Sequence, residues 1–452
     1  MSVDMSNARA VPRLSGQDLA FLAFETRRRP MHIAVRASFE LPLGVPAPTL
    51  SGLRAIFARA VAREPALQRR LLRSWFRKPR WGDIGPIDVA RHIRSLRVDP
   101  KHRARDVDVC LRAPLDRDLP LWEIWLLDTP ERPRTFELLL KVHQVLIDSV
   151  GAVALFERLL ESAPVPTLVG RGPGPELYPD AESLGSAANL AHDPFRSTDR
   201  TALNGGIAEQ RHRRLDVPSA SFDRAARRLG GSRNDLLLSV VTGTLQRWFA
   251  HSRCSFPMRL RAFCPVSPRP RDSRAGFGNR ISPWFVPLPM DEPTLAGRVA
   301  RVNAATRAFR RKQAEGRGNQ MARWVQRLGG WVARLGMAIA NYRRDYNLIV
   351  TSARGPRALS LLGAHLRELT AFAPLVPGQR VAVAVVEYEG RLFFGVTEGW
   401  KRATRGRRLM ESLAEELTLL ERSALRDDRA DSPRALRTSR ALRSRVSAAV
   451  GS

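Results

Sequence analysis

The sequence predicts an α/β fold with two domains. Segments in which apolar residues recur at every second position, the period of a β-strand, alternate with segments in which they recur at helical spacing. The two patterns meet in Thr135 to Leu160, which is predicted to form a strand, a tight loop and a helix. The 452 residues are enough for two ordinary domains. A hydrophobic content of 44% indicates a globular rather than a disordered protein.

The chain is strongly basic. It has 75 Lys and Arg residues against 44 Asp and Glu residues, which gives a formal net charge of +31. Such an excess favours an anionic partner, namely anionic lipid, a phosphorylated ligand such as CoA, or nucleic acid. It is also explained by an Arg-rich composition in which the charges only solvate helix faces. No zinc-finger spacing and no aromatic RNA-binding motif occurs in the sequence, so we expect no specific nucleic-acid partner.

The cysteines and the terminal segment bear on the cellular compartment. Cys110, Cys254 and Cys264 are odd in number and have neither CxxC nor metal-ligand spacing. We interpret them as reduced, buried thiols of a cytoplasmic protein and expect no metal site. The N-terminal residues lack the apolar segment of a signal peptide, and no apolar run is long enough to span a bilayer. Any membrane association is therefore expected to be peripheral.

In the first part of the chain, helix and strand patterns follow one another closely. Ser15 is the expected N-cap of a short helix at residues 19–24, and a strand follows at about residues 32–39. An amphipathic helix comes next and is expected to end before Pro65. The apolar face of that helix consists of Leu53, Ile56, Phe57, Ala60 and Val61.

The next segments lead to the most informative stretch. Residues 73–98 are basic and aromatic and are predicted to form a loop. Trp122 begins a predicted strand and is expected to pack beneath the stretch that follows. In that stretch, His143, Gln144 and Asp148 fall at the end of a strand and in the loop after it. Polar groups at the end of a buried strand are where α/β proteins commonly place chemistry.

A long segment of weak periodicity divides the chain. Residues 162–210 are rich in Pro, Gly, Ser and Asp and are predicted to be a linker that crosses between domains. We therefore place an N-terminal domain at residues 1–161, a C-terminal domain at residues 211–425 and a basic tail at residues 426–452. The tail is either disordered or a basic amphipathic helix that binds an anionic surface.

The predicted C-terminal domain also alternates helices and strands. Its second helix is expected to begin at Asn234 and Asp235, which are either ordinary N-cap residues or help to shape a site between the domains. Asn279 lies between two predicted strands and either orients a ligand carbonyl or stabilises a turn. The other expected elements are strands at 260–266 and 281–288, a strand ending near Ser352, a hairpin at 381–396 and a helix at 409–420.

Residues 310–340 combine a basic run with one apolar helical face that carries Trp324 and Trp331. One interpretation is a core helix with a solvated basic edge. The other is an interfacial helix, with Trp at the depth of lipid headgroups and Arg on anionic phosphates.

The segment Lys141 to Ser149 resembles the HHxxxDG motif of bacterial wax ester synthase/diacylglycerol acyltransferases. These enzymes belong to the superfamily of CoA-dependent acyltransferases and peptide-synthetase condensation domains. His143 and Asp148 match the first His and the Asp, whereas Gln144 replaces the second His and Ser149 replaces the Gly. Other segments similar to the family occur in the family's order over nearly the whole chain: MH, PLW, ND, PVS followed by GN, and a final hairpin.

The resemblance implies two chloramphenicol-acetyltransferase-like domains, each a mixed sheet with flanking helices, and a substrate tunnel between them. In the family the second His is the general base, the first His is largely structural, and the Asp pairs with an Arg to hold the loop. The candidate catalytic positions are therefore His143, Gln144 and Asp148. The candidate substrate-binding residues are Asn234, Asp235 and Asn279.

The departures from the motif carry a chemical prediction. The amide of Gln144 has no useful pKa near neutrality, so it cannot act as a general base. If strand geometry persists, His143 and Gln144 point to opposite sides, and His143 points away from the ligand. Ser149 replaces a Gly that permits a tight turn, so a shifted loop is expected.

The resemblance implies transfer of a long-chain acyl group from acyl-CoA to a long-chain alcohol or diacylglycerol, as in wax ester and triacylglycerol synthesis. Acyl-CoA is then a co-substrate, and no other cofactor is implied. Because of Gln144, we expect reduced activity. The alternative is a non-catalytic protein that binds acyl-CoA or lipid. Either function implies a cytoplasmic protein held peripherally at an anionic membrane or lipid-body surface.

Overall fold

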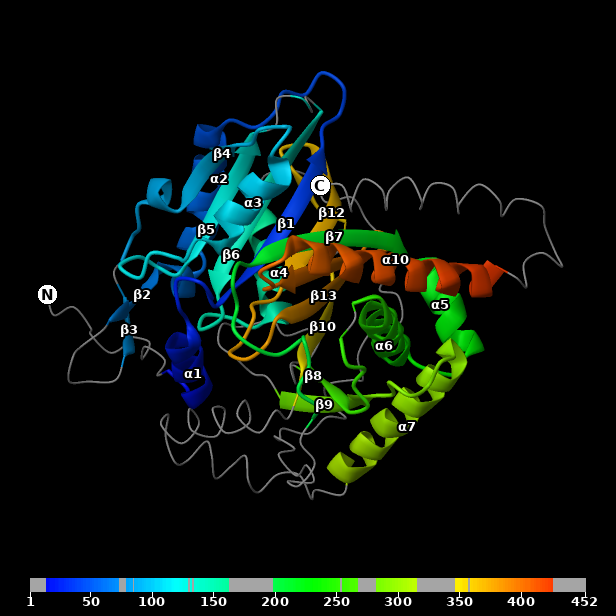
Figure 1. Ribbon diagram of the computed structural model, residues 1–452. Coiled ribbons are helices and arrows are strands. Elements are labelled where there is room, and N and C mark those ends of the chain that lie inside the picture. The colour runs from blue at the N-terminus through cyan, green and yellow to red at the C-terminus, as the bar shows by residue number, and fades with distance from the viewer. Residues whose placement is uncertain are drawn as a thin grey trace, which may run out of the picture.

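Two six-stranded mixed sheets form the centre of the molecule (Figure 1). The structure is a computed structural model that describes residues 14–72, 79–83, 85–128, 131, 134–161, 198–252, 254–266, 282–314, 346–356 and 358–425. Helices flank both sheets. The predicted α/β class with two mixed sheets and flanking helices is confirmed.

The first sheet has the strand order β11-β12-β1-β6-β5-β4. Its strands are β1 (His32–Glu40), β4 (Ile93–Arg97), β5 (Trp122–Asp128), β6 (Thr135–His143), β11 (Ser360–Leu361) and β12 (Ala364–Phe372). Only the β4–β5 pair is parallel. β11 and β12 come from the predicted C-terminal domain, so two of its strands complete the sheet that the N-terminal domain forms. Strand periodicity did not predict this exchange, because it does not identify a strand's partner.

The second sheet has the strand order β7-β14-β13-β10-β8-β9. Its strands are β7 (Arg211–Pro218), β8 (Leu260–Val266), β9 (Ser282–Leu288), β10 (Leu348–Arg354), β13 (Val381–Tyr388) and β14 (Arg391–Glu398). The predicted hairpin is confirmed as β13 and β14, which turn at Glu389 and Gly390. Both turn residues have positive φ, as a type I′ hairpin turn requires.

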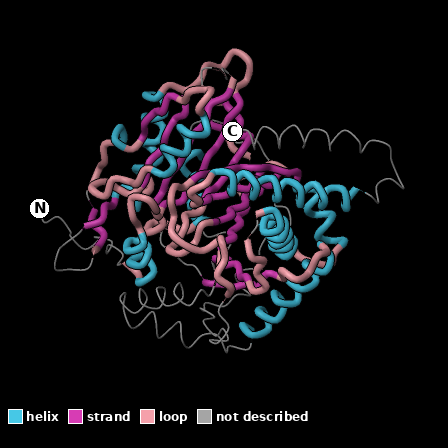
Figure 2. The backbone as a smooth tube through the Cα atoms, in the orientation of Figure 1, coloured by secondary structure: helices cyan, strands magenta, loops and turns pink. Residues whose placement is uncertain are grey.

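The described helices are α1 (Gly16–Phe24), α2 (Leu50–Ala62), α3 (Arg103–Arg112), α4 (Ser149–Glu161), α5 (Ser219–Arg228), α6 (Arg233–His251), α7 (Leu295–Ala314) and α10 (Ala403–Leu425). Ser15 caps α1 as predicted, in a capping box with Asp18. The 3-10 turns are η1 (Pro65–Gln68) and η2 (Val89–Arg91). Figure 2 shows how these helices surround the strands.

The prediction of a loop at residues 73–98 is wrong in part. That segment contains β3 (Arg80–Asp83), which pairs with β2 (Arg69–Leu72), as well as η2 and β4. β4 is an edge strand of five residues with alternating burial. A strand so short and so basic lacks the apolar run that would distinguish it from a loop.

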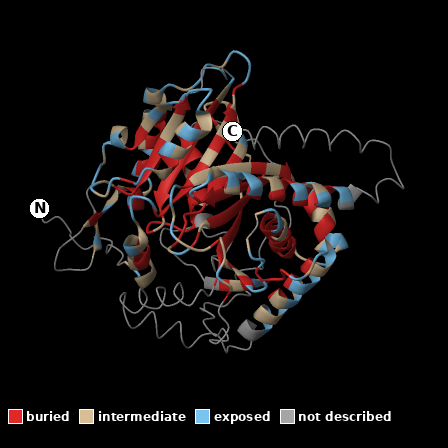
Figure 3. Cartoon of the chain, viewed as in Figure 1, coloured by how far each residue is buried: buried red, intermediate tan, exposed pale blue. Residues whose placement is uncertain are grey.

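The cores lie between each sheet and its helices (Figure 3). α2 and α4 pack on one face of the first sheet, and α3 packs on the other. α5, α6 and α10 cover one face of the second sheet. Trp122 is buried as expected, and its Nε1 donates a hydrogen bond to the Leu67 carbonyl at 2.8 Å. The two sheets approach closely at Gly395, where a Cβ would meet the Ala371 carbonyl.

Several predictions fall outside the described residues. These are most of the linker, Asn279, residues 315–340 of the apolar and basic segment, and the basic tail. Of the cysteines, Cys110 and Cys264 are buried as expected, whereas Cys254 is only half-buried. Within the described part of the chain, no helix is both long and apolar enough to cross a membrane.

Candidate functional site

The loop after β6 is anchored to both neighbouring strands. The His143 amide donates to the Leu121 carbonyl, and the Gln144 amide donates to the Met31 carbonyl, each at 2.9 Å. The chain then turns, with the Leu146 amide donating to the His143 carbonyl at 2.9 Å. These bonds fix where the residues of the motif lie relative to the first sheet.

Ser149 lies where the loop meets α4. It is the first residue of α4, in helical conformation. Among the described residues, the only non-glycine residues with positive φ are Leu362 and Glu389. The backbone at Ser149 is therefore open to any L-residue. α4 begins at Ser149, and a shift of the loop relative to the loop of the family stays a prediction.

Asp148 caps the helix that follows the loop. Its Oδ1 accepts a hydrogen bond from the Gly151 amide at 2.8 Å, and its carbonyl accepts from the Ala152 amide at 2.8 Å. This is the geometry of an N-cap. The carboxylate is buried, and a Cβ at Gly151 would collide with the buried side chain of Ile147. The loop therefore uses Asp148 to hold the start of α4.

The imidazole of His143 is buried, with 1% of the residue exposed. Its Nδ1 accepts a hydrogen bond from the Val145 amide at 3.0 Å. A backbone amide can only donate, so in the neutral ring the proton lies on Nε2. Nε2 faces the Glu25 carboxylate, with 3.4 Å between Nε2 and Oε1. Both ring nitrogens are thus directed at protein groups.

Glu25 connects His143 to two other segments. Its Oε1 accepts from the Met31 amide at 3.2 Å, and its Oε2 accepts from Arg117 Nε at 2.9 Å. Burial alone would raise the pKa of Glu25, but the hydrogen bonds and charges of His143 and Arg117 lower that pKa to about 2. Sequence reasoning missed Glu25 as a site residue, because Glu25 lies at the end of α1, far along the chain from the motif.

Acid unfolding tests the strength of this cluster. The folded-state pKa of Glu25 is about 2 instead of 4.5, so its contribution to stability is present above pH 4.5 and is lost as the pH falls toward 2. The shift corresponds to about 3 kcal/mol of unfolding free energy. We expect Glu25→Gln to lose that amount in urea unfolding at neutral pH, and the difference from the wild type to shrink below pH 4.5. Glu40→Gln, at a half-exposed ion pair, is the control, and a pH-independent difference for Glu25→Gln would contradict the account.

His143 lies on the α3 side of the first sheet. Lys141, two residues earlier on the same face, is fully buried, and its Nζ donates to the Ala113 carbonyl at 2.7 Å. His32, directly across from His143 on β1, contacts the Leu111 carbonyl. Burial and the charge of Lys141 lower the pKa of His32 well below its ordinary value, which keeps the ring neutral. This face is packed against α3, so His143 points toward the interior there.

The opposite face of β6 belongs to the core that α2, α4 and part of the second sheet share. Val142 pairs with Ile33, and Ile33 lines a cavity of about 10 Å³ together with residues of β10, β12 and β13. Gln144 follows Val142 and is half-buried in the turn. A cavity of this size holds about one water molecule. The substrate tunnel between the domains stays a prediction.

The N-terminus of α6 places the second predicted pair of residues. The N-cap is Ser232 rather than Asn234 or Asp235. Asp235 closes the capping box: its Oδ2 accepts from Ser232, and its Oδ1 accepts from Thr306 Oγ1 at 2.7 Å. Its oxygens are therefore engaged in folding α6 and in holding α7.

Asn234 has a different environment. Only 1% of it is exposed, and within the described part of the chain neither its Oδ1 nor its Nδ2 has a hydrogen-bond partner. A buried amide without partners is uncommon, because each unpaired group costs about 1–3 kcal/mol. Of the two predicted substrate-binding residues that the structure describes, Asn234 and Asp235, it is Asn234 whose polar atoms remain available.

Two family models and several known proteins match the sequence of this chain. Residues 14–202 match the model of the wax ester synthase/diacylglycerol acyltransferase catalytic domain, and residues 277–421 match the model of the C-terminal domain of the same family. Tgs4 of Mycobacterium tuberculosis, named as a probable diacylglycerol O-acyltransferase, is 26% identical, with 91% of this chain and 97% of Tgs4 covered. The protein tgs1 of the same organism is also named as a probable diacylglycerol O-acyltransferase. It is 25% identical to this chain, with 70% of this chain and 76% of tgs1 covered.

Solved structures share the fold. The wax ester synthase/diacylglycerol acyltransferase of Marinobacter aquaeolei VT8 superposes with a TM-score of 0.67, at 22% identity, with 91% of this chain and 100% of that chain covered. The starter condensation domain of rhizomide synthetase, a mutant in complex with C8-CoA and Leu-SNAC, superposes with a TM-score of 0.62, at 14% identity, covering 91% and 94%. At these identities the likeness shows that the chain shares the fold of these proteins.

Proposed function

Because the chain belongs to the wax ester synthase/diacylglycerol acyltransferase family, we propose that it transfers a long-chain acyl group from acyl-CoA to a long-chain alcohol or diacylglycerol, at a low rate. The observation that carries the low rate is the identity and surroundings of two adjacent residues. Gln144 stands at the general-base position of the motif. Both ring nitrogens of His143 beside it face protein groups, the Val145 amide and the Glu25 carboxylate.

The reaction needs a proton to move. The alcohol oxygen attacks the thioester carbonyl, the new C–O bond forms, and the C–S bond breaks to release CoA thiolate. The alcohol proton must leave as the bond forms, and the thiolate must receive one. An imidazole with a pKa near the working pH can perform both transfers, which is typically worth about 10²- to 10⁴-fold in rate. The Gln144 amide can only donate and accept hydrogen bonds.

His143 is poorly placed to replace the missing base. A general base needs a free lone pair within reach of the alcohol. The Nδ1 lone pair accepts the Val145 amide, and Nε2 faces Glu25 in a buried position. Asp148 is held at the start of α4 by its bond to Gly151. We therefore assign structural roles to His143 and Asp148, and a binding role to Gln144.

The same observations favour one second function, a protein that binds acyl-CoA or lipid without transferring the acyl group. The two proposals differ only in chemistry, and both include acyl-CoA as the ligand and no other cofactor. Two facts support acyl-CoA. A condensation-domain neighbour was solved with C8-CoA, and the net charge of +31 suits a ligand with several phosphates. We place either activity at the cytoplasmic surface of a membrane or lipid body, where the lipid alcohol resides.

A paired measurement separates the functions. Binding of palmitoyl-CoA is measured by calorimetry, and ester formation from palmitoyl-CoA with hexadecanol or dipalmitoylglycerol is followed by mass spectrometry. Saturable binding with slow ester formation is expected. Binding without ester above the background assigns the non-catalytic function. Absence of binding would contradict both proposals, and rapid ester formation would contradict the proposed lack of a base.

We expect the side chain of Asn234 to lower the stability of the protein and to strengthen its binding of ligand. Replacement by Leu, which has a similar volume, removes the unpaired amide, so the unfolding free energy should rise by about 1 kcal/mol. If the amide binds ligand, the same variant should bind palmitoyl-CoA several-fold more weakly. Asp235→Asn serves as the matched control, since loss of the carboxylate in its capping box should lower stability by about 1 kcal/mol. A less stable Asn234→Leu with unchanged binding would contradict the ligand role.

A further inference from the structure

A cavity of about 310 Å³ lies where the start of β8 meets the end of β9, in the part of Figure 1 where the chain passes from β9 to α7. Three of its lining residues are arginines, namely Arg259, Arg261 and Arg301. We call it the arginine cavity. Cavities that hold small ligands begin at about 300 Å³, so the arginine cavity is large enough for a small molecule.

The charges around the arginine cavity favour an anion. Its lining contains three arginines, which stay protonated, and one acid, Asp291. Asp291 is ionised at neutral pH, since the hydrogen bond from Arg301 lowers its pKa. Asp199 pairs with Arg259 beside the cavity, so the cations still exceed the anions by three to two. A surface of this charge attracts a ligand of the opposite sign.

Two of the arginines are held in place by carboxylates. Arg259 Nε donates to Asp199 Oδ1 at 3.1 Å, and Asp199 Oδ2 accepts from the Met258 and Arg259 amides at 2.8 and 2.9 Å. Arg301 Nη1 donates to Asp291 Oδ2 at 2.6 Å. A guanidinium has five N–H donors, so these bonds leave donors for a ligand. Side chains that are restrained beforehand lose less entropy when the ligand binds.

The third arginine stands on a strand. The Arg261 amide donates to Asn347 Oδ1 at 3.0 Å, and the Arg261 carbonyl accepts from the Asn347 amide at 2.9 Å. Its partner in the β8–β9 register is Pro287, which is exposed. Met258, also in the lining, is 58% exposed. The cations therefore lie beside apolar side chains, which suits a ligand that has an organic group as well as a charge.

We propose that the arginine cavity binds a phosphomonoester, with Arg259, Arg261 and Arg301 on the phosphate and with Met258 and Pro287 against the organic group. A planar guanidinium binds two phosphate oxygens at once. Two kinds of ligand carry this group, the ribose 3′-phosphate of CoA and a free phosphorylated metabolite. The first rests on the proposed function, whereas the second does not.

Calorimetric titration of the full chain at about 0.15 M salt tests the proposal. The probes are glycerol 3-phosphate and adenosine 3′,5′-bisphosphate, which is the phosphorylated end of CoA. We expect saturable binding of these esters and no binding of glycerol. Arg259→Gln with Arg301→Gln should weaken the binding by at least about 10-fold, because hydrogen bonds from two charged groups are lost. Both side chains are more than half exposed, so the variant should fold as well as the wild type.

Asp291→Asn should have the opposite effect. It removes the anion from the lining while its amide oxygen can still accept from Arg301, so the phosphate esters should bind several-fold more tightly. Arg91→Gln with Arg134→Gln is the matched control, since both arginines are similarly exposed and lie near a carboxylate. An equal loss in this control would overturn the proposal, because the attraction would then come from the net charge. Unchanged or weaker binding by Asp291→Asn would also overturn it.

Palmitoyl-CoA and its analogue without the ribose 3′-phosphate identify the source of the phosphate. If the Arg259 and Arg301 double variant loses affinity for palmitoyl-CoA but not for the analogue, the ligand is CoA. If it loses only the binding of glycerol 3-phosphate, the ligand is a free metabolite. Both results support the arginine cavity.

The same titrations separate the arginine cavity from the proposed function. A wild type that binds palmitoyl-CoA but neither phosphate ester, with unchanged palmitoyl-CoA binding in the double variant, rejects the cavity and leaves the function intact. Binding of the phosphate esters without binding of palmitoyl-CoA supports the cavity and rejects the function.

Discussion

Replacement of Gln144 by His is expected to raise the rate of ester formation by roughly 10²-fold or more, the lower end of what a positioned general base contributes. Gln144 is half-buried in the turn after β6. Its backbone amide donates to the Met31 carbonyl, so the position of the backbone is fixed independently of the side chain. A His at this position has the pKa range that the proton transfer needs. The measurement is initial-rate ester formation from palmitoyl-CoA and hexadecanol, with binding of palmitoyl-CoA determined on the same preparations.

Two control variants accompany this prediction. Gln144→Asn changes the size of the amide without adding a base, so its rate should stay near that of the wild type. His143→Ala removes the ring that accepts the Val145 amide and faces Glu25, so it should lower stability. If Gln144→His gives no increase while palmitoyl-CoA still binds, the missing base is not what limits the rate, and the non-catalytic function gains support.

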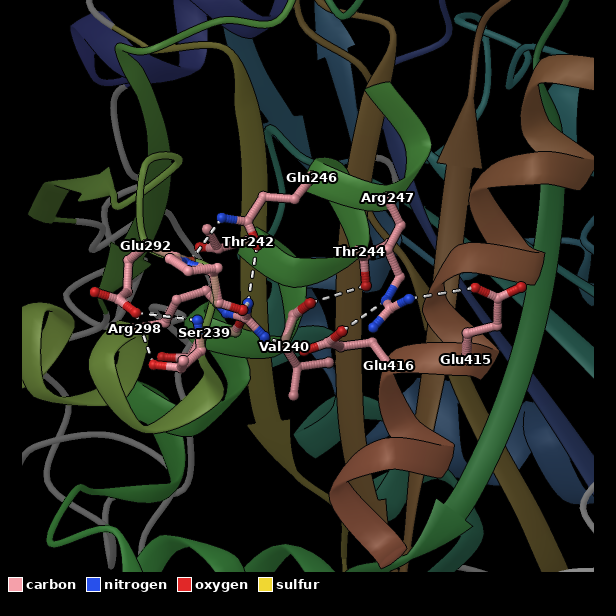
Figure 4. A network of polar contacts seen from close by, with 12 residues as sticks. Ser239, Val240, Thr242, Thr244, Gln246, Arg247, Glu292, Arg298, Glu415 and Glu416 are labelled. Atoms are coloured by element: carbon pink, nitrogen blue, oxygen red, sulfur yellow. Dashed lines mark hydrogen bonds and ion pairs between the residues drawn. The ribbon is translucent and has the colours of Figure 1, made fainter. Parts of the chain in front are cut away.

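Truncation of Glu416 is expected to cost about 3–5 kcal/mol of unfolding free energy, because it leaves a buried cation without its partner. Glu416 forms ion pairs with Arg298 and Arg247, and both Arg298 and Glu416 are almost fully buried. Arg298 also donates to the Ser239 carbonyl at 3.2 Å and to Gln246 Oε1 at 2.9 Å (Figure 4). This network joins α6, α7 and α10 on the second sheet. It passes beside Gly243, where a Cβ would collide with Glu416 and Arg298.

The neighbouring residue supplies the matched control. Glu415 lies 3.7 Å from Arg247 with 55% of its side chain exposed, so its ion pair is screened by solvent. Glu415→Ala should therefore change the unfolding free energy by less than about 1 kcal/mol. Urea unfolding of Glu416→Ala and Glu415→Ala at neutral pH makes the comparison. Equal losses in the two variants would show that burial of the network contributes nothing.

Local signals made much of the fold predictable. Ser15 was identified as a cap, and the strand and helix around the motif were identified from periods of two and 3.6 residues. Non-local pairing was not predictable in this way. β12 joins the first sheet beside β1, although it follows β10 of the second sheet in the chain. A strand's period fixes which residues face inward but leaves its partner undetermined.

The site was predicted in part. The sequence placed His143, Gln144 and Asp148 in one loop, and the structure gives that loop its anchors. The sequence also contains the spacing of a capping box, Ser232 to Asp235, which predicts that α6 starts at Arg233. Glu25 had no such signal. Its role depends on a contact with a residue far along the chain, and only the packed structure reveals it.

Under the proposed function, these residues form a site in which the supporting structure of the motif is kept and its proton-transfer group is replaced. Asp148, the start of α4 and the Glu25–His143–Arg117 cluster hold the loop. The same proposal makes the amide of Gln144 the group that contacts the reacting alcohol. The central claim is therefore that neither His143 nor any other group supplies the base that Gln144 lacks.

The pH dependence of the single-turnover rate tests this claim most directly. With saturating palmitoyl-CoA, the wild type is expected to show a low rate without a titration in the range of a histidine, around pH 6.5. Gln144→His is expected to acquire one, with the rate rising as its imidazole loses a proton. A wild-type rate that already rises through this range, and loses that rise in His143→Ala, would identify His143 as the base and contradict the account.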